Sequence, residues 1–156
     1  MLRVGDIAPP IDAVTSLGTR FVLAEQQGLC TVVYFFPKAF TPGCTAEAKH
    51  FRDNQVELEL AGASVVGVST DAHETQCRFA QSVDARFPLI ADADRRISRA
   101  YDVLWPLIGI AHRVTYIVSP ERVIEAVFRH ELDADAHRDD VLTFVNKKFR
   151  ALRSVG

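Results

Sequence analysis

The sequence predicts a single α/β domain, residues 1–156, in which a central mixed sheet is flanked by helices. The length is about that of one domain, and 48% hydrophobic with 24% charged residues is typical of a globular chain with one core. Two apolar runs, residues 30–36 and 64–69, are each followed by a helical pattern, and a hairpin and a closing helix come later. This order, βαβα and then ββα, implies parallel strands joined by right-handed crossovers, followed by an antiparallel pair.

The first part of the chain contains three predicted strands and a long helix. Residues 11–14 and 20–23 are short β-prone pieces around a turn, and we expect a small hairpin there. Residues 30–36 are apolar without alternation, which is typical of a strand covered on both faces and therefore central in the sheet. Apolar or small residues then recur from Pro42 to about residue 60, which predicts one helix. Proline is acceptable at a helix start, and Gly62 is expected to end this helix.

The second part alternates shorter elements. Residues 64–69 contain three valines and predict a buried strand, and Asp71 and Glu74 have capping-box spacing for a helix to about residue 85. A short strand at residues 87–90 and a short helix at residues 92–101, capped by Asp92, should follow. Residues 114–118 and 123–128 flank a turn and predict an antiparallel hairpin. The closing helix has one apolar face at 3.6-residue spacing, formed by Val141, Leu142, Phe144, Val145 and Phe149.

Charge and cysteine content exclude several function classes. Eighteen basic and twenty acidic residues give a net charge of −2 without long runs of one sign, so nucleic acid and anionic membranes are disfavoured as partners. The N-terminal residues lack the continuous apolar run of an export signal, and no apolar stretch is long enough to span a bilayer. We therefore expect a soluble, cytoplasmic protein. Cys30, Cys44 and Cys77 lack CxxC or zinc-type spacing, which predicts reduced thiols and no metal site.

Cys44 lies at the corner between the predicted central strand and the following helix. A cysteine at a helix N-terminus faces unpaired backbone N–H groups and the positive end of the helix dipole, and both favour the thiolate. Pro37 and Thr41 precede it with the spacing Pro-x-x-x-Thr-x-x-Cys. The Thr41 hydroxyl can cap the helix and also donate a hydrogen bond at the same place. The pattern therefore predicts thiolate chemistry at Cys44.

This motif resembles the peroxidatic signature of the peroxiredoxins, within the AhpC/TSA family, and most closely their bacterioferritin-comigratory or peroxiredoxin Q type. The resemblance extends over nearly the whole chain, and its segments are residues 34–48, 67–69, 79–80, 87–92 and 113–118. It implies a thioredoxin-like three-layer fold. It also implies an enzyme that reduces hydrogen peroxide and organic hydroperoxides without a cofactor and is regenerated by thioredoxin or a similar thiol reductant.

The resemblance assigns roles to residues around Cys44. Arg113 would come from a neighbouring strand, where its charge favours the thiolate and its planar donors can hold a peroxide oxygen; the alternative is a solvated strand-edge charge. Pro37 would shield the pocket from water. Glu47 would orient Arg113, or it is a surface carboxylate in an i,i+4 pair.

Oxidation would convert Cys44 to a sulfenic acid that a second thiol must reduce. Many relatives of this type have a resolving cysteine five residues later, but that position is Lys49 here. Other relatives have it on the next helix, where Cys77 lies about one turn from the expected position near Ala80. Cys77 is thus a candidate resolving cysteine. Its disulfide would require the first turn of the Cys44 helix to unwind, and otherwise an external thiol reduces a one-cysteine enzyme.

Other interpretations stay open. A general thiol-disulfide oxidoreductase is disfavoured by the lack of CxxC, and a redox-sensing or holdase module would use Cys44 only as a switch. Cys30 is expected to be buried packing. The apolar residues 103–110 can roof the active site or form a dimer contact, and we expect a monomer or a weak homodimer.

Overall fold

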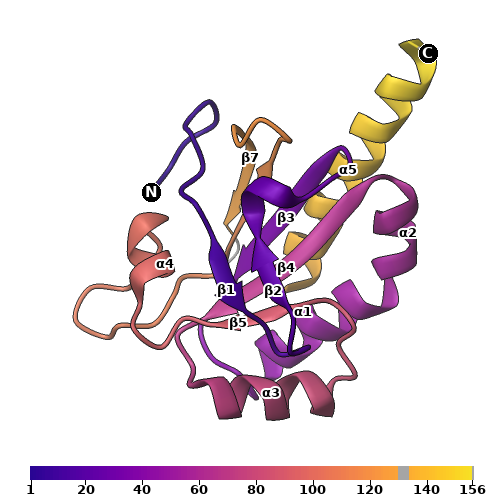
Figure 1. The fold of residues 1–156 in the computed structure, drawn as a ribbon. Coiled ribbons are helices and arrows are strands. Elements are labelled where there is room, and N and C mark those ends of the chain that lie inside the picture. The colour runs from indigo at the N-terminus through magenta and orange to yellow at the C-terminus, as the bar shows by residue number, and fades with distance from the viewer. Residues whose placement is uncertain (130–133, 156) are drawn as a thin grey trace.

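A five-stranded mixed sheet forms the centre of the computed structural model, which describes residues 1–129 and 134–155 (Figure 1). The strand order is β5-β4-β3-β6-β7, with β3, β4 and β5 parallel and β6 and β7 antiparallel to their neighbours. The strands are β3 (Cys30–Phe35), β4 (Ala63–Ser69), β5 (Leu89–Ala91), β6 (Val114–Val118) and β7 (Ile124–Arg129). The predicted mixed α/β architecture is confirmed, with the apolar run of residues 30–36 at its centre.

Helices and a small hairpin surround this sheet. The predicted N-terminal hairpin is present as an antiparallel pair in which Asp12 lies opposite Val22. Its strands are β1 (Asp12–Val14) and β2 (Arg20–Val22), and a 3-10 turn, η1 (Leu23–Glu25), follows. The helices are α1 (Pro42–Asp53), α2 (Gln55–Leu60), α3 (His73–Ser82), α4 (Arg96–Ala100) and α5 (Ala134–Val155). In the part of the chain that the structure describes, no helix has the length and hydropathy that a membrane span requires.

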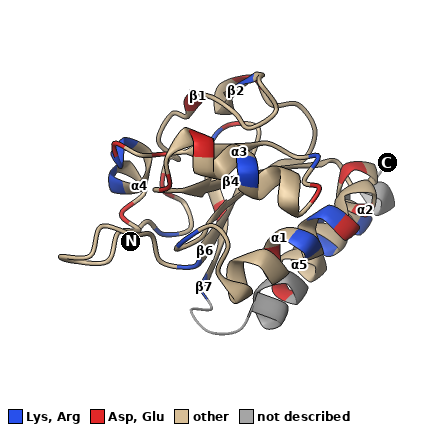
Figure 2. Ribbon diagram, turned by 90° about the horizontal axis from the view of Figure 1, so that it is seen from below, with Lys and Arg blue, Asp and Glu red and all other residues tan. Residues whose placement is uncertain are grey.

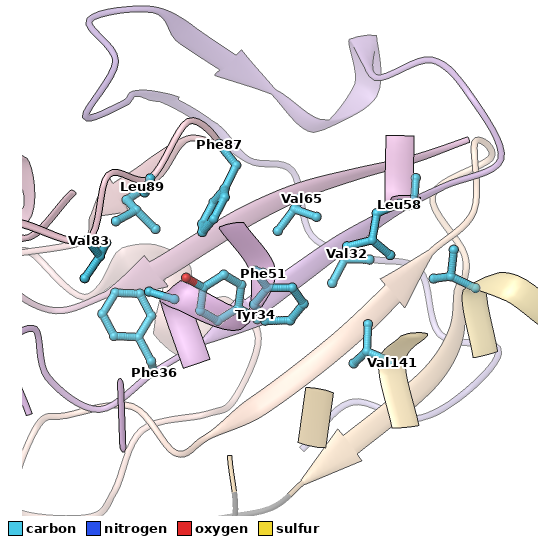
Figure 3. Packing of buried hydrophobic residues seen from close by; sticks show 14 of the residues in the cluster. Val32, Tyr34, Phe36, Phe51, Leu58, Val65, Val83, Phe87, Leu89 and Val141 are labelled. Carbon is cyan, nitrogen blue, oxygen red and sulfur yellow. The ribbon is translucent and has the colours of Figure 1, made fainter. Parts of the chain in front are cut away.

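Strand β3 divides the core into two layers because its side chains alternate between the faces of the sheet. Tyr34 lies on the face covered by α1, α2, α3 and α5, where its ring stacks on Phe51 at a centroid distance of 4.6 Å (Figure 3). Phe35 lies on the opposite face, among residues of the N-terminal segment and α4. Each fully buried aromatic side chain contributes about 1.5–3 kcal/mol of hydrophobic free energy. Packing on both faces thus fixes the position of β3, and with it the point at which the chain leaves the C-terminal end of this strand.

The predicted long helix from Pro42 is two helices, and this expectation was wrong at Asn54. Asn54 has φ −107° and ψ 9°, outside the helical range, and its side-chain amide donates to the His50 carbonyl over 2.8 Å. A short amide side chain competes in this way for backbone groups and interrupts a helix. Gly62, with a φ of 84°, follows α2 and allows the chain to turn into β4.

The predicted capping box at the start of α3 is absent. Ala72 is the N-cap residue and no side chain caps the helix, which ends at Ser82 rather than near residue 85. The Asp71 carboxylate instead accepts hydrogen bonds from the backbone N–H of Ala39 and from the Ser69 hydroxyl. The Asp71 carboxylate, which the local spacing predicted as a helix cap, therefore makes a tertiary contact instead.

The start of α4 also differs from the prediction. The N-cap is Arg95, with a φ of 62°, so the helix begins later than predicted. Asp92 still serves the helix start, because its carboxylate accepts the N–H groups of Ile97 and Ser98 over 3.1 and 2.7 Å. The apolar face predicted for the closing helix is confirmed in α5, where Val141 and Val145 are buried in the core. Figure 3 shows Val141 in this position.

Candidate active site

Cys44 is buried in the first turn of α1, with 1% of its surface exposed. Pro42 is the first residue of this helix, and Thr41 precedes it in an extended conformation. Because β3 ends at Phe35, residues 36–41 form the short connection that places the cysteine beyond the C-terminal end of this central strand. The predicted strand-to-helix corner is confirmed. The unpaired N–H groups and the dipole of α1 therefore act on a thiol that has little contact with water.

Arg113 lies directly against this cysteine. Its Nη2 is 3.5 Å from Cys44 Sγ, and its side chain is buried. The register of the sheet explains this contact between Arg113 and Cys44, since Val114, the first residue of β6, pairs with Phe35 at the end of β3. Burial opposes the charge of Arg113, but the nearby Glu47 and Cys44 outweigh it and raise the pKa of the guanidinium. The structure thus excludes a solvated position for Arg113.

Glu47 holds the other end of the guanidinium. Its Oε1 accepts a hydrogen bond of 2.7 Å from Arg113 Nη1, and its side chain is fully buried. The surface i,i+4 pair considered for this residue does not form. Burial raises the pKa of Glu47 to about 7, although the charge of Arg113 opposes the rise. Arg113 is therefore fixed between a carboxyl group and the cysteine sulfur, with both partners on α1.

Gly43 is a site residue that the sequence reasoning missed. A Cβ atom at this position would lie 2.9 Å from Arg113 Nη2, which is closer than side-chain carbons normally approach. The absence of a side chain therefore lets Arg113 reach Cys44. The only signal in the sequence was a glycine immediately before the cysteine.

Thr41 and Pro37 lie in the connection before α1, but Thr41 does not cap the helix as expected. Its hydroxyl donates to the carbonyl of Lys38 over 2.8 Å, so it closes a turn within the connection. Since the hydroxyl proton is used there, the lone pairs of its oxygen are the groups left to face a ligand. Pro37 is half-buried at the end of the central strand. Neither side chain adds a charge to the site.

Cys77 lies on α3 and is not bonded to Cys44, since all three cysteines are free. The residue is partly exposed, and its sulfur lies 3.4 Å from Nε2 of His73, one turn earlier. Ala80 faces the core, and three residues along a helix correspond to a rotation about 60° short of a full turn, so Cys77 lies beside the core-facing stripe. Cys30 is buried in the core, as expected, and burial raises the pKa of its thiol to about 11.

The apolar segment before Arg113 is a projecting hairpin. Leu104 and Ala111 pair across it, and Leu107 and Ile108 near its tip are 108% and 63% exposed. In Figure 1 it extends to the left of α4. The rings of Trp105 and His112 contact each other with a centroid distance of 4.0 Å and a tilt of 37°, which fixes the base of the hairpin next to Arg113. Side chains this exposed do not roof Cys44.

Residues 4–127 match the AhpC/TSA family. The chain belongs to this family. It is 35% identical over 152 residues to Peroxiredoxin Bcp of Escherichia coli (strain K12), an alignment that covers 94% of this chain and 97% of that protein. Among solved structures, the chain is similar to Peroxidoxin BcpB from Mycobacterium tuberculosis, with a TM-score of 0.86 and 32% identity over 97% of this chain and 98% of that one.

A second similar structure is the peroxiredoxin Q of Xanthomonas campestris, with a TM-score of 0.81 and 31% identity over 89% of this chain and 91% of that one. These findings confirm the thioredoxin-like peroxiredoxin fold and the Bcp and peroxiredoxin Q type. They also support the predicted peroxidase function, with a peroxide substrate and a thiol reductant, and do not favour the rival classes.

Proposed function

We propose that this peroxiredoxin reduces hydrogen peroxide and organic hydroperoxides through the thiolate of Cys44. The observation that carries the proposal is the contact of 3.5 Å between Arg113 Nη2 and Cys44 Sγ, with Nη1 of the same group held by Glu47. This buried guanidinium places a fixed positive charge directly beside the sulfur. It also offers planar donors to a second ligand beside the sulfur.

The chemical step follows from this arrangement. The sulfur attacks one peroxide oxygen and forms an S–O bond, the O–O bond breaks, and its electron pair leaves on the other oxygen. That oxygen takes up a proton to become water or an alcohol, and Cys44 becomes a sulfenic acid. Negative charge thus moves from sulfur to oxygen, and Arg113 stabilises it at both positions.

Thr41 and Pro37 complete the site in this proposal. Because the Thr41 hydroxyl donates to Lys38, its oxygen accepts a hydrogen bond from the peroxide O–H and orients the oxygen that the sulfur attacks. Pro37 lacks an N–H donor, and in this proposal its half-buried ring limits the access of water to the sulfur. Glu47 positions Arg113 through its ion pair with Nη1.

Regeneration requires a thiol. We propose that thioredoxin or a similar protein supplies the reducing equivalents, and that Cys77 is the candidate for an intermediate disulfide because it is a partly exposed residue on the helix after β4. Attack of Cys77 on the sulfenic acid would release water and form the disulfide. In the one-cysteine alternative, an external thiol attacks Cys44 directly. Reduced cysteines fit the cytoplasm, and we expect a monomer or a weak homodimer.

The test is peroxide consumption by the Cys44→Ser variant with dithiothreitol as reductant. We expect activity to fall to background while the far-ultraviolet circular dichroism spectrum stays unchanged, because serine has nearly the same volume. Cys30→Ser is the matched control, since this thiol is buried in the core away from Arg113. Full activity of the Cys44→Ser variant would overturn the proposal.

A further inference from the structure

The connection that delivers Cys44 to the active site is attached to the segment before α3. The backbone N–H of Ala39 donates a hydrogen bond of 2.8 Å to Asp71 Oδ2, across 32 residues of sequence. Asp71 lies just before the N-cap of α3. Figure 1 shows α3 running beneath the sheet next to the start of α1. A single carboxylate therefore joins the backbone before Cys44 to the helix that carries Cys77.

Asp71 is itself held in place by a buried polar chain. The Ser69 hydroxyl donates to the same Oδ2 over 2.7 Å, and Gln76 Nε2 donates to Ser69 Oγ over 3.0 Å. The same Gln76 nitrogen also donates to the carbonyl of Ile90 over 2.8 Å. The side chains of Ser69 and Gln76 are buried, with 0% and 1% exposed. Successive hydrogen bonds in a buried chain polarise one another, so the carboxylate is a rigid point of attachment.

A second contact reinforces this attachment. The ring of Phe40 packs edge-on against Phe79 of α3, with a centroid distance of 5.4 Å. Phe40 has a φ of 67°, which is unfavourable for a residue with a bulky side chain. Its side chain is 53% exposed, so burial alone does not explain this conformation. We call the hydrogen bond from the Ala39 N–H to Asp71 the anchor. A strained residue directly beside this anchor indicates that the connection is held in place by α3 and would relax if the hydrogen bond were broken.

We propose that Asp71 is a positioning residue for Cys44, and that its hydrogen bond to Ala39 holds the cysteine in the buried arrangement beside Arg113. The proposal rests on Cys44 being the oxidised thiol. With the anchor in place, the sulfur meets the peroxide next to the guanidinium. When the anchor opens, the connection and the first turn of α1 loosen, and the oxidised sulfur becomes accessible to a thiol.

Two rates should therefore change in opposite directions when the anchor is removed. Reaction of the reduced enzyme with peroxide needs the buried arrangement and should slow. Reduction of the sulfenic acid by a thiol needs exposure and should accelerate, so that less sulfenic acid reacts with a second peroxide to give sulfinic acid. A residue with only a general structural role would lower both rates together.

The experiment compares Asp71→Ala with Asp71→Asn in the Cys77→Ser background, so that an external thiol is the only reductant. Quenched-flow mass spectrometry follows Cys44 through thiol, sulfenic and sulfinic states with hydrogen peroxide and dithiothreitol. Loss of a hydrogen bond to a charged group corresponds to a change of about tenfold, so Asp71→Ala should react about tenfold more slowly with peroxide. Its sulfenic acid should be reduced several-fold faster. Asparagine keeps a side-chain oxygen that can accept the Ala39 N–H, and it should restore most of both rates.

The matched control is Glu74→Ala. Glu74 is also acidic and lies in the first turn of α3, but its exposed carboxylate pairs with Arg78. Its loss should leave both rates unchanged. If Asp71→Ala fails to fold, Ser69→Ala weakens the same anchor and should shift both rates in the same directions by a smaller factor. Unchanged rates in a folded Asp71→Ala variant, or a parallel fall of both, would overturn the proposal. If Cys44 of the unsubstituted enzyme is not oxidised, the proposed function fails instead.

Discussion

Helices α1 and α3 begin in the same way but place their cysteines in different surroundings. Each follows a parallel strand, each has an N-cap residue in the extended conformation, Thr41 or Ala72, and neither has a side-chain cap. Cys44 in the first turn of α1 is buried against Arg113, whereas Cys77 one turn into α3 is partly exposed beside His73. The comparison shows that two helices with similar starts place their cysteines in different surroundings. Burial and a fixed cation distinguish Cys44.

Charged residues on the surface and beside Cys44 are arranged differently. Figure 2 shows acidic and basic residues interspersed along the helices in this view. Beside Cys44, by contrast, a guanidinium and a carboxylate lie 2.7 Å apart with 6% and 0% of their side chains exposed. In this dry environment the orientation of a single cation decides where negative charge is stabilised.

Loss of Arg113 should have the largest effect, because it removes what distinguishes the two cysteines. In Arg113→Ala we expect the second-order rate constant with hydrogen peroxide to fall by at least about a hundredfold. The rate constant of Arg113→Lys should lie between those of the unsubstituted enzyme and Arg113→Ala. Lysine keeps the charge but cannot contact Glu47 and Cys44 with one planar group. Competition against a peroxidase of known rate measures both. Arg99→Ala, at an exposed arginine of α4, is the control, and an equal rate in Arg99→Ala and Arg113→Ala would contradict the assignment.

A smaller effect should follow from moving Arg113 without removing it. In Gly43→Ala the new Cβ would lie 2.9 Å from Nη2, so the guanidinium must shift away from the sulfur. We expect the peroxide rate constant to fall about tenfold while the free energy of unfolding changes by less than about 1 kcal/mol. Thr45→Ala, at the next residue after Cys44, provides a control for substitution at the helix start. An unchanged rate in Gly43→Ala would show that the close approach is unimportant.

The smallest effect should come from Glu47 and appear in the pH dependence of stability. Its pKa rises from 4.5 to about 7 on folding, so the folded state binds the extra proton between these values. Stability from this group is therefore present below pH 4.5 and is lost as the pH rises through about 7. Glu47→Gln removes this term.

Urea unfolding at a series of pH values tests this expectation. Between pH 4.5 and 7.5 the free energy of unfolding of the unsubstituted enzyme should fall by about 1–3 kcal/mol relative to Glu47→Gln. Parallel curves for the two proteins would contradict the burial and pairing described for this carboxyl group.

The main features of the fold could be predicted because they depend on local patterns. The apolar run of β3 indicated a central strand, and the residues of α5 repeated with helical spacing. Asn54 was not recognised as a helix break, since the small and apolar residues continue on both sides of it. Asp71 had the spacing of a capping residue, but the N–H of Ala39 is a partner that no local pattern contains.

The candidate site could be predicted only as far as its motif extends. Arg113 lies against Cys44 as expected, because strand register brings residue 113 to the end of β3, whereas the sequence left two alternatives open for Glu47. The roles of Gly43 and of the Thr41–Lys38 hydrogen bond depend on atoms brought together by tertiary packing. The anchor at Asp71 joins three segments that are distant in the sequence, so only the folded chain shows it.

The most direct test of the account is to map the oxygen added by one equivalent of hydrogen peroxide. The oxidised protein is trapped with a sulfenic-acid reagent, digested and analysed by mass spectrometry for all three cysteine peptides. We expect the adduct on Cys44, or a Cys44–Cys77 disulfide if Cys77 resolves, with Cys30 unmodified in either case. A sulfenic acid first formed on Cys77 while Cys44 stays reduced would contradict the proposal that Cys44, held beside the buried cation, is the peroxidatic cysteine.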